Sequence, residues 1–119
     1  MASQNTPTIA DLFQAAADDN RLRLLKCLQV RPACVCELVQ ATGLPQPRIS
    51  RHLRVLRDAG LVCDCRDAQW VQYCLVRPQQ SSAEEAVLSL IASLLEDDEQ
   101  VLADRRRLAD ASREQCVTA

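Results

Sequence analysis

The sequence predicts a mainly α-helical domain with one small β-hairpin, and three observations support this expectation. Apolar residues recur at helical spacing along most of the 119 residues. The stretch "LVCDCRDAQWVQYCL" is instead rich in β-forming residues on both sides of a short polar turn. A hydrophobic content of 48% is enough for one core, so we expect a single domain over residues 1–119.

Two helices are expected in the first 31 residues. Thr8 can cap the first helix, whose apolar positions follow helical spacing at Ile9, Leu12, Phe13 and Ala16. Polar residues 18–20 can cap the second helix, whose apolar face holds Leu22, Leu25 and Leu28. Arg31-Pro32 should end this helix, because proline cannot donate the next backbone hydrogen bond.

Two helices separated by a tight turn are expected next. The first covers residues 33–41 and stops near Gly43, and the second begins with Pro47 in its first turn and ends near Gly60. Helices joined by a few residues that include glycine form the helix-turn-helix pattern. The second helix of such a pair enters the major groove of double-stranded DNA, so we expect an operator as the partner.

The side chains of this reading helix divide into two sets. Ile49, Leu53 and Leu56 form an apolar stripe that should face the core. The DNA-binding candidates project outward near its N-terminal end, and they are Gln46, Arg48, Ser50, Arg51, His52 and Arg54. Residues 20–57 carry a local charge of +7, although the whole chain has a net charge of −2. We interpret this basic block as a phosphate-binding face, although any solvated amphipathic helix also exposes arginines.

The remaining chain predicts a wing and a dimer interface. Strands over residues 61–66 and 70–75, joined near Asp67-Ala68, form the wing of a winged helix-turn-helix. Ser82 and Glu85 match a capping box. A helical apolar stripe then continues through Val87, Leu90, Ile91, Leu94, Leu95, Val101, Leu102 and Leu108. Because this stripe is longer than a small domain can cover, the first and last helices are expected to form a homodimer interface.

The composition also excludes several classes of protein. No apolar run is long enough for a membrane span or a secretory signal, so we expect a cytoplasmic protein without a membrane partner. The seven cysteines are an odd number, which fits a disulfide framework poorly and predicts reduced thiols. The sequence has no Cys-x-x-Cys motif and no glycine-rich phosphate loop, so we expect that it is not an enzyme.

Four motifs together resemble the ArsR family of winged-helix repressors, and most closely its arsenic-responsive members. They are "DDNRLRLLKCL", "CVCELV", "QPRISRHLRVLRDAGLV" and "WVQYCL", within a resemblance that covers residues 10–95. The resemblance implies a homodimer that leaves its operator when As(III) or Sb(III) binds cysteine thiolates, with no other cofactor required. Cys34 and Cys36 match the family's Cys-x-Cys pair at the start of the helix before the reading helix.

The residues themselves suggest how this pair could act as a trigger. Helical residues two apart point about 200° away from each other, so binding one ion should strain the start of the helix. Pro32 places Cys34 and Cys36 near the first turn, where the helix dipole is expected to lower the thiol pKa. A soft ion would then distort the helix that supports the reading helix.

The third ligand and a rival site remain open. The enterobacterial-type motif has a third cysteine at a position that is Val39 here. Cys27, Cys116, solvent or glutathione could complete the set. The rival site lies in the wing, where Cys63 and Cys65 share a strand face and cross-strand pairing brings Cys74 close.

The inducer also has alternatives. His52 is the only histidine and is assigned to the DNA face, so the histidine and carboxylate sites of zinc- or nickel-sensing relatives cannot be built. Trivalent arsenic and antimony are therefore favoured, with cadmium or lead next. A thiol redox or reactive-sulfur sensor of the same fold is the other possibility.

Overall fold

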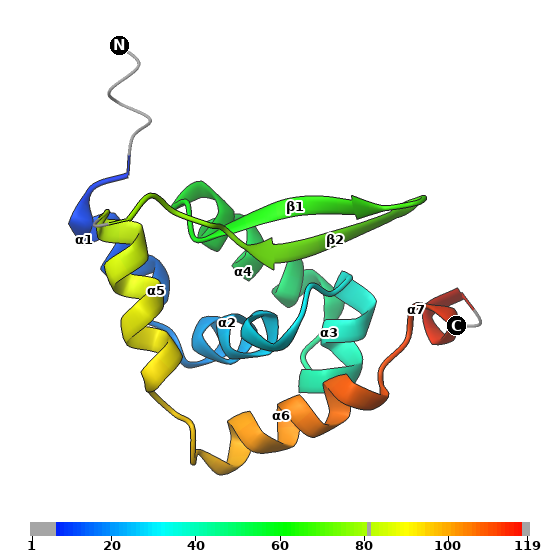
Figure 1. The fold of residues 1–119 in the computed structure, drawn as a ribbon. Helices are drawn as coiled ribbons and strands as arrows, with labels where there is room; N and C mark the ends of the chain where they lie inside the picture. The colour runs from blue at the N-terminus through cyan, green and yellow to red at the C-terminus, as the bar shows by residue number, and fades with distance from the viewer. Residues whose placement is uncertain (1–6, 81, 118–119) are drawn as a thin grey trace.

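The computed structural model describes residues 7–80 and 82–117, and within them it is mostly helical with one antiparallel hairpin (Figure 1). This confirms the predicted fold class. The elements in chain order are α1 (Ile9–Ala16), α2 (Asp19–Val30), α3 (Val35–Thr42), α4 (Gln46–Asp58), β1 (Val62–Asp67), β2 (Trp70–Leu75), α5 (Ala83–Ser93), α6 (Glu99–Asp110) and α7 (Arg113–Val117).

The predicted caps begin the first two helices. Thr8 Oγ1 accepts a hydrogen bond from the Asp11 amide at 3.1 Å, and the Asp11 carboxylate accepts one from the Thr8 amide at 2.9 Å. The Asp18 carboxylate accepts from the amides of Asn20 and Arg21 at the start of α2. These bonds satisfy donors that a helix start leaves without a partner, so the sequence correctly located both starts.

The helix-turn-helix is formed by α3 and α4. Gly43 ends α3 with a φ of +75°, a left-handed conformation that favours glycine. We expected α3 to start at residue 33, and it starts two residues later. The reason is that Ala33 pairs with the wing: its amide donates to the Tyr73 carbonyl at 3.1 Å, and its carbonyl accepts from the Tyr73 amide at 2.8 Å.

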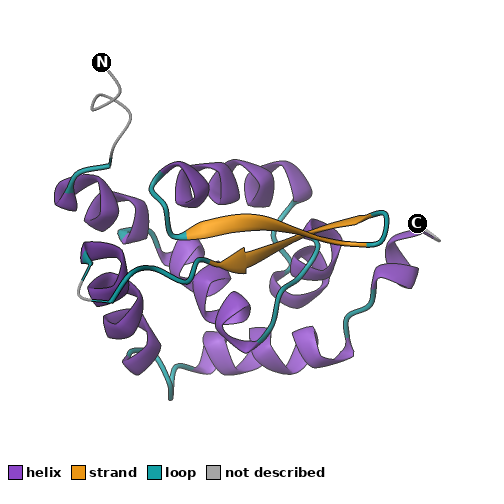
Figure 2. Cartoon of the chain, turned by 45° about the horizontal axis from the view of Figure 1, so that its top comes forward, coloured by secondary structure: helices purple, strands orange, loops and turns teal. Residues whose placement is uncertain are grey.

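The wing has a regular antiparallel register that runs from the Val62–Leu75 pair to the Asp67–Trp70 pair. Side chains alternate between its two faces. The face that contains Val62, Tyr73 and Leu75 packs on the core, as expected for a half-buried hairpin. Figure 2 shows the hairpin lying over the helices, with the turn at its far end.

The C-terminal apolar stripe differs from the prediction of one continuing helical stripe. It is not continuous, because α5 ends at Ser93 with Leu94 as its C-cap, and Leu95 has a φ of +62° before α6 begins. Helix α6 folds back beneath α2 and α3, so Val101 and Leu108 are buried inside the chain (Figure 1). The α5 part of the stripe lies beside α1 and keeps Leu90 exposed, and Leu102 of α6 is also 38% exposed. No described helix is both long enough and apolar enough to cross a membrane.

Candidate DNA-binding and thiol sites

Helix α4 turns its apolar stripe inward, as predicted. Ile49, Leu53 and Leu56 are at most 1% exposed. Four of the six DNA-binding candidates are exposed, and they are Gln46, Arg48, Arg51 and Arg54. The three arginines have no ion-pair partner within residues 7–80 and 82–117, so their charges are available to phosphate.

The other two candidates, Ser50 and His52, are only half-exposed. Ser50 Oγ accepts a hydrogen bond from the Gln46 amide group at 3.2 Å. His52 Nδ1 lies 3.3 Å from Arg21 Nη1, which places one edge of the ring against α2. Burial lowers the pKa of His52, and neighbouring arginines lower it further although Asp18 opposes them. The structure therefore places His52 only partly outward, and its role in DNA binding stays a prediction.

The basic block of residues 20–57 is not one phosphate-binding face. Its first four basic side chains are Arg21, Arg23, Lys26 and Arg31, and none is exposed. Arg23 Nε lies 2.8 Å from Asp104 on α6, and the fully buried Lys26 Nζ lies 2.6 Å from Glu96. Sequence distance hid these pairs, because the acidic partners come from the far end of the chain. Of this block, Arg48, Arg51 and Arg54 remain exposed and without an ion pair among the described residues, whereas Arg57 pairs with Asp64 at 3.3 Å.

Cys34 and Cys36 lie at the start of α3, as predicted. Cys34 is the N-cap residue, with extended backbone angles and only 4% exposure, and its amide donates to Glu37 Oε1 at 2.9 Å. Cys36 is half-buried in the first turn and is disulfide-bonded in this structure, which differs from the reduced thiol that the sequence predicted. Because Cys34 is not helical, the 200° separation of two helical positions does not apply to this pair. The predicted strain on binding an ion therefore loses its geometric basis.

The pKa of the Cys34 thiol also differs from the expectation. It is raised, because burial penalises the thiolate and the Glu37 carboxylate lies close, while Arg113 and Arg31 oppose these effects. The helix dipole does not overcome burial at this position. Cys34 is therefore a protonated thiol at neutral pH, and it must lose its proton when it binds a soft ion.

The candidates for a third ligand are placed less favourably. Cys27 is fully buried in the core, and burial raises its pKa to about 12. Val39 is half-buried on α3. The Cys116 side chain lies outside the described residues. Within the part of the chain that the structure describes, no three His, Cys, Asp or Glu residues are grouped closely enough to hold a metal ion.

Ser112 and the start of α7 link the C-terminal half of α3 to the wing, and no sequence signal predicted this contact. The Gln40 amide group donates to the Ser112 carbonyl at 2.9 Å. Arg113 Nη2 lies 2.9 Å from Asp67 Oδ2 in the turn of the wing, and its guanidinium lies 5.5 Å from the centroid of the Trp70 ring. The C-terminal segment therefore contacts both the thiol-bearing helix and the wing.

The rival thiol cluster exists in the wing. Cys63 and Cys74 are directly opposite each other in the register, and their Sγ atoms are 3.3 Å apart. Burial raises the pKa of Cys74 to about 12, and hydrogen bonds with the Cys65 and Cys63 thiols add to this effect. Cys63, Cys65 and Cys74 are all free thiols of intermediate exposure.

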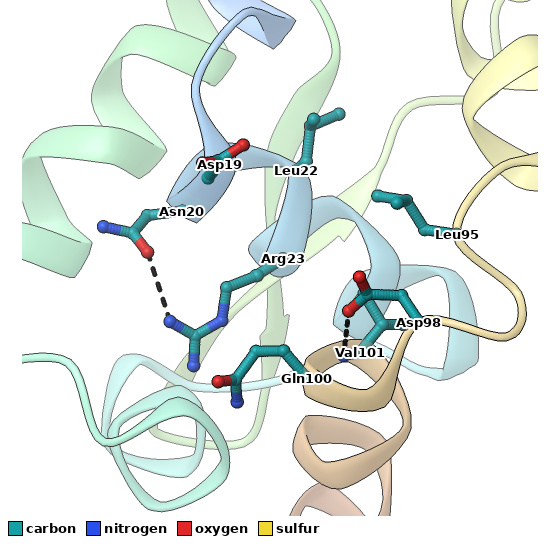
Figure 3. A pocket seen from close by; sticks show the side chains of 8 residues that line it. All are labelled: Asp19, Asn20, Leu22, Arg23, Leu95, Asp98, Gln100 and Val101. Atoms are coloured by element: carbon teal, nitrogen blue, oxygen red, sulfur yellow. Dashed lines mark hydrogen bonds between the residues drawn. The ribbon is translucent and has the colours of Figure 1, made fainter.

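A surface hollow between the start of α2 and the α5–α6 connection contains no predicted site residue (Figure 3). Its polar lining is already engaged, since Asn20 accepts from Arg23 at 3.1 Å and Asp98 accepts from the Val101 amide at 3.0 Å. The two chemistry-bearing regions are therefore the exposed face of α4 and the cysteine pairs.

Comparison with known proteins identifies the family. The family model described as "Bacterial regulatory protein, arsR family" matches residues 18–63. Over 106 residues the chain is 41% identical to the arsenic resistance transcriptional regulator ArsR1 of Pseudomonas putida, covering 88% of this chain and 79% of that protein. The chain belongs to the ArsR family.

Two further comparisons agree with this ArsR-family assignment. The arsenical resistance operon repressor of Escherichia coli is 43% identical over 65 residues, which cover 54% of this chain and 56% of that protein. The crystal structure of the transcriptional repressor BigR from Xylella fastidiosa has a TM-score of 0.63 and 28% identity, covering 76% of this chain and 87% of that one. This ArsR-family chain is therefore a winged-helix transcriptional repressor and not an enzyme.

Proposed function

We propose that this repressor is a cytoplasmic homodimer that binds operator DNA through α4 and dissociates when As(III) or Sb(III) binds Cys34 and Cys36. The observation that carries the proposal is the position of the two cysteines, of which Cys36 is disulfide-bonded in this structure and supplies a thiol once it is reduced. They lie at the start of α3, which packs directly against the reading helix α4. No additional cofactor is required in this scheme.

The neighbours of Cys34 suggest how the signal reaches the DNA-binding surface. Ala33 precedes Cys34 and makes two backbone hydrogen bonds with Tyr73 in β2. A displacement of Cys34 on binding an ion would therefore act on the wing through Ala33 and on α4 through α3. By linkage, the ion drives release only if it binds the DNA-free conformation more tightly.

The exposed apolar residues of α1 and α5 support the homodimer. These two helices contact each other, and together they expose Ile9 (62%), Phe13 (54%), Leu90 (51%) and Leu94 (46%). A patch of large apolar side chains on adjacent helices is typical of a protein–protein interface. A two-fold interface here would place two α4 helices on successive major-groove faces of one operator.

The first experiment is a titration of the reduced protein with arsenite while the release of its own promoter fragment is followed. We expect the unmodified repressor to be released, and Cys34→Ser and Cys36→Ser to bind DNA normally but resist release. Serine keeps the size of the side chain and removes the soft thiol ligand. Cys65→Ser is the matched control and should respond like the unmodified chain.

Other inducers are distinguished in the same assay by adding cadmium, lead or an organic oxidant instead of arsenite. The assay is needed to rank these inducers, because the raised pKa of Cys34 disfavours its thiolate toward oxidants and soft ions alike. If the two variants are released by arsenite as readily as the unmodified chain, the assignment to Cys34 and Cys36 is wrong.

A further inference from the structure

The wing of this repressor contains a thiol pair that the function proposed above does not use. Cys63 on β1 and Cys74 on β2 face each other across the hairpin, with their Sγ atoms 3.3 Å apart. We propose that this pair is a second, two-thiol binding site for a trivalent arsenical that keeps one carbon substituent.

The pair is held in a fixed geometry by the sheet. The Tyr73 amide and carbonyl both bond to Ala33, so they point away from β1. In an antiparallel ladder the next pair along, Cys63 and Cys74, is then of the hydrogen-bonded type. Two neighbouring strands therefore fix both Cα atoms, and binding needs only side-chain rotation.

The thiols also lie on the accessible face of the hairpin. Residues alternate along each strand, so Cys63, Cys65 and Cys74 share one face, while Val62, Tyr73 and Leu75 on the other face pack on the core. Asp64, on the core side, reaches Arg57 of α4 at 3.3 Å. The thiol face therefore points away from α4, and its cysteines keep intermediate exposure.

The sulfur separation indicates the kind of centre that fits. An atom bonded at about 2.3 Å to both sulfurs, which are 3.3 Å apart, would have an S–X–S angle of about 90°. This angle suits a pyramidal trivalent centre better than tetrahedral zinc. The sulfurs are also too far apart for a disulfide, whose bond is about 2.05 Å, unless both side chains move.

The number of facing thiols indicates the substituent. Trivalent arsenic forms three bonds, and the hairpin offers two thiols that directly face each other. Cys65 stands opposite Gln72 rather than opposite a cysteine, and its thiol contacts Cys74 from the neighbouring position on the same face. The described residues also contain no group of three ligands close enough for a metal ion. The third bond of arsenic is therefore left for a group that the protein does not supply.

The binding step is a condensation without electron transfer. With an arsenical of the type R–As=O, arsenic forms one bond to Sγ of Cys63 and one to Sγ of Cys74. The bond between arsenic and oxygen breaks, and the two thiol protons leave with that oxygen as water. The raised pKa of Cys74 means that its proton is present to be transferred at neutral pH.

The test uses the reduced full chain with Cys34→Ser and Cys36→Ser, so that the α3 thiols are absent, and phenylarsine oxide as the probe. Intact-mass titration in competition with a small dithiol should show one tightly bound phenylarsenic group. Adding Cys63→Ser or Cys74→Ser should weaken binding at least about 100-fold, because the second bond is no longer intramolecular. Cys65→Ser is the matched control and should leave binding unchanged.

A second measurement needs no substitution. On the unmodified chain, phenylarsine oxide should protect Cys63 and Cys74 from alkylation and leave Cys65 reactive, as mapped by peptide mass. The proposal is overturned if the α3 double variant binds no phenylarsenic, if the adduct survives Cys63→Ser, or if Cys65→Ser weakens it equally. Neither measurement involves DNA. A failure of the wing-site proposal is therefore distinguished from a failure of the proposed function, which would appear as arsenite not releasing the operator.

Discussion

At the scale of single residues, neighbours on α4 have different roles despite similar positions in the sequence. Arg51 is exposed and has no ion pair among the described residues, whereas His52 is half-buried against Arg21. The sequence pattern placed both side chains outward. The difference arises because α2 packs against this side of α4, a contact that helical periodicity alone does not contain.

We therefore expect different effects from substituting these two residues. Arg51→Ala should weaken operator binding by about 1–3 kcal/mol if it contacts a base edge, with little change in thermal unfolding. His52→Ala should also lower stability by about 1 kcal/mol, because it removes a partly buried polar contact. Operator titration and thermal melts of both variants check this. Equal melting temperatures for the two variants would contradict the half-buried position of His52.

Cys27 gives a prediction on pH dependence. Its pKa is raised to about 12 in the folded protein because of burial, so the folded state keeps a proton that the unfolded state loses above its ordinary value of 9.0. This contribution to stability is complete below pH 9 and is lost as the pH rises toward 12. Between pH 8 and pH 10, the free energy of unfolding should therefore fall by about 1 kcal/mol less in Cys27→Ala than in the unmodified chain. Urea unfolding at both pH values measures the difference.

At the scale of elements, α6 has a role that its sequence does not reveal. It folds under α2 and α3, and the buried Asp104 carboxylate accepts hydrogen bonds from Arg23 at 2.8 and 3.0 Å and from Gln100 at 2.9 Å. Removing one member of a buried ion pair leaves the other charge without compensation. Helix α6 therefore stabilises the helix-turn-helix by packing against α2 and α3.

Asp104→Ala should destabilise the fold by about 3–5 kcal/mol, because Arg23 would remain largely buried without its partner. The matched control is Arg107→Ala, since Arg107 is 57% exposed and lies 3.9 Å from the same carboxylate. An exposed pair contributes about 0–1 kcal/mol, so this variant should unfold almost like the unmodified chain. Equal losses in the two variants, measured by urea unfolding, would disprove this role for the buried pair.

At the scale of the whole molecule, the apolar residues of the terminal helices have different environments. Val101 and Leu108 of α6 are buried within the chain, whereas α1 and α5 leave large apolar side chains exposed and Leu102 of α6 stays 38% exposed. The exposed apolar surface is therefore smaller than the sequence suggested. The dimer interface proposed above lies on the side of the molecule where α1 and α5 meet (Figure 1).

Phe13→Glu should convert the dimer into a monomer, because it places a charge at the centre of the proposed apolar interface. Val30→Glu is the matched control, since Val30 is equally exposed at 54% but lies on α2. Sedimentation velocity distinguishes the two. A dimer that survives Phe13→Glu would place the interface elsewhere, and a monomer in both variants would make the effect non-specific.

The sequence by itself determined the local order of the molecule. Thr8 and Asp18 begin helices, Gly43 ends one, and the alternating pattern around Cys63 and Cys74 sets the register of the wing. These features depend on hydrogen bonds and side-chain periodicity within a few residues, so a single chain pattern contains them. The exposed arginines of α4 were predictable for the same reason.

Only the tertiary structure decided which charges and thiols remain available. Arg23 and Lys26 are neutralised by Asp104 and Glu96, more than sixty residues away in sequence. Cys34 keeps its proton because burial and Glu37 outweigh the helix dipole. Free charge and thiol pKa depend on desolvation and on partners from distant segments, and these are set only when the chain packs.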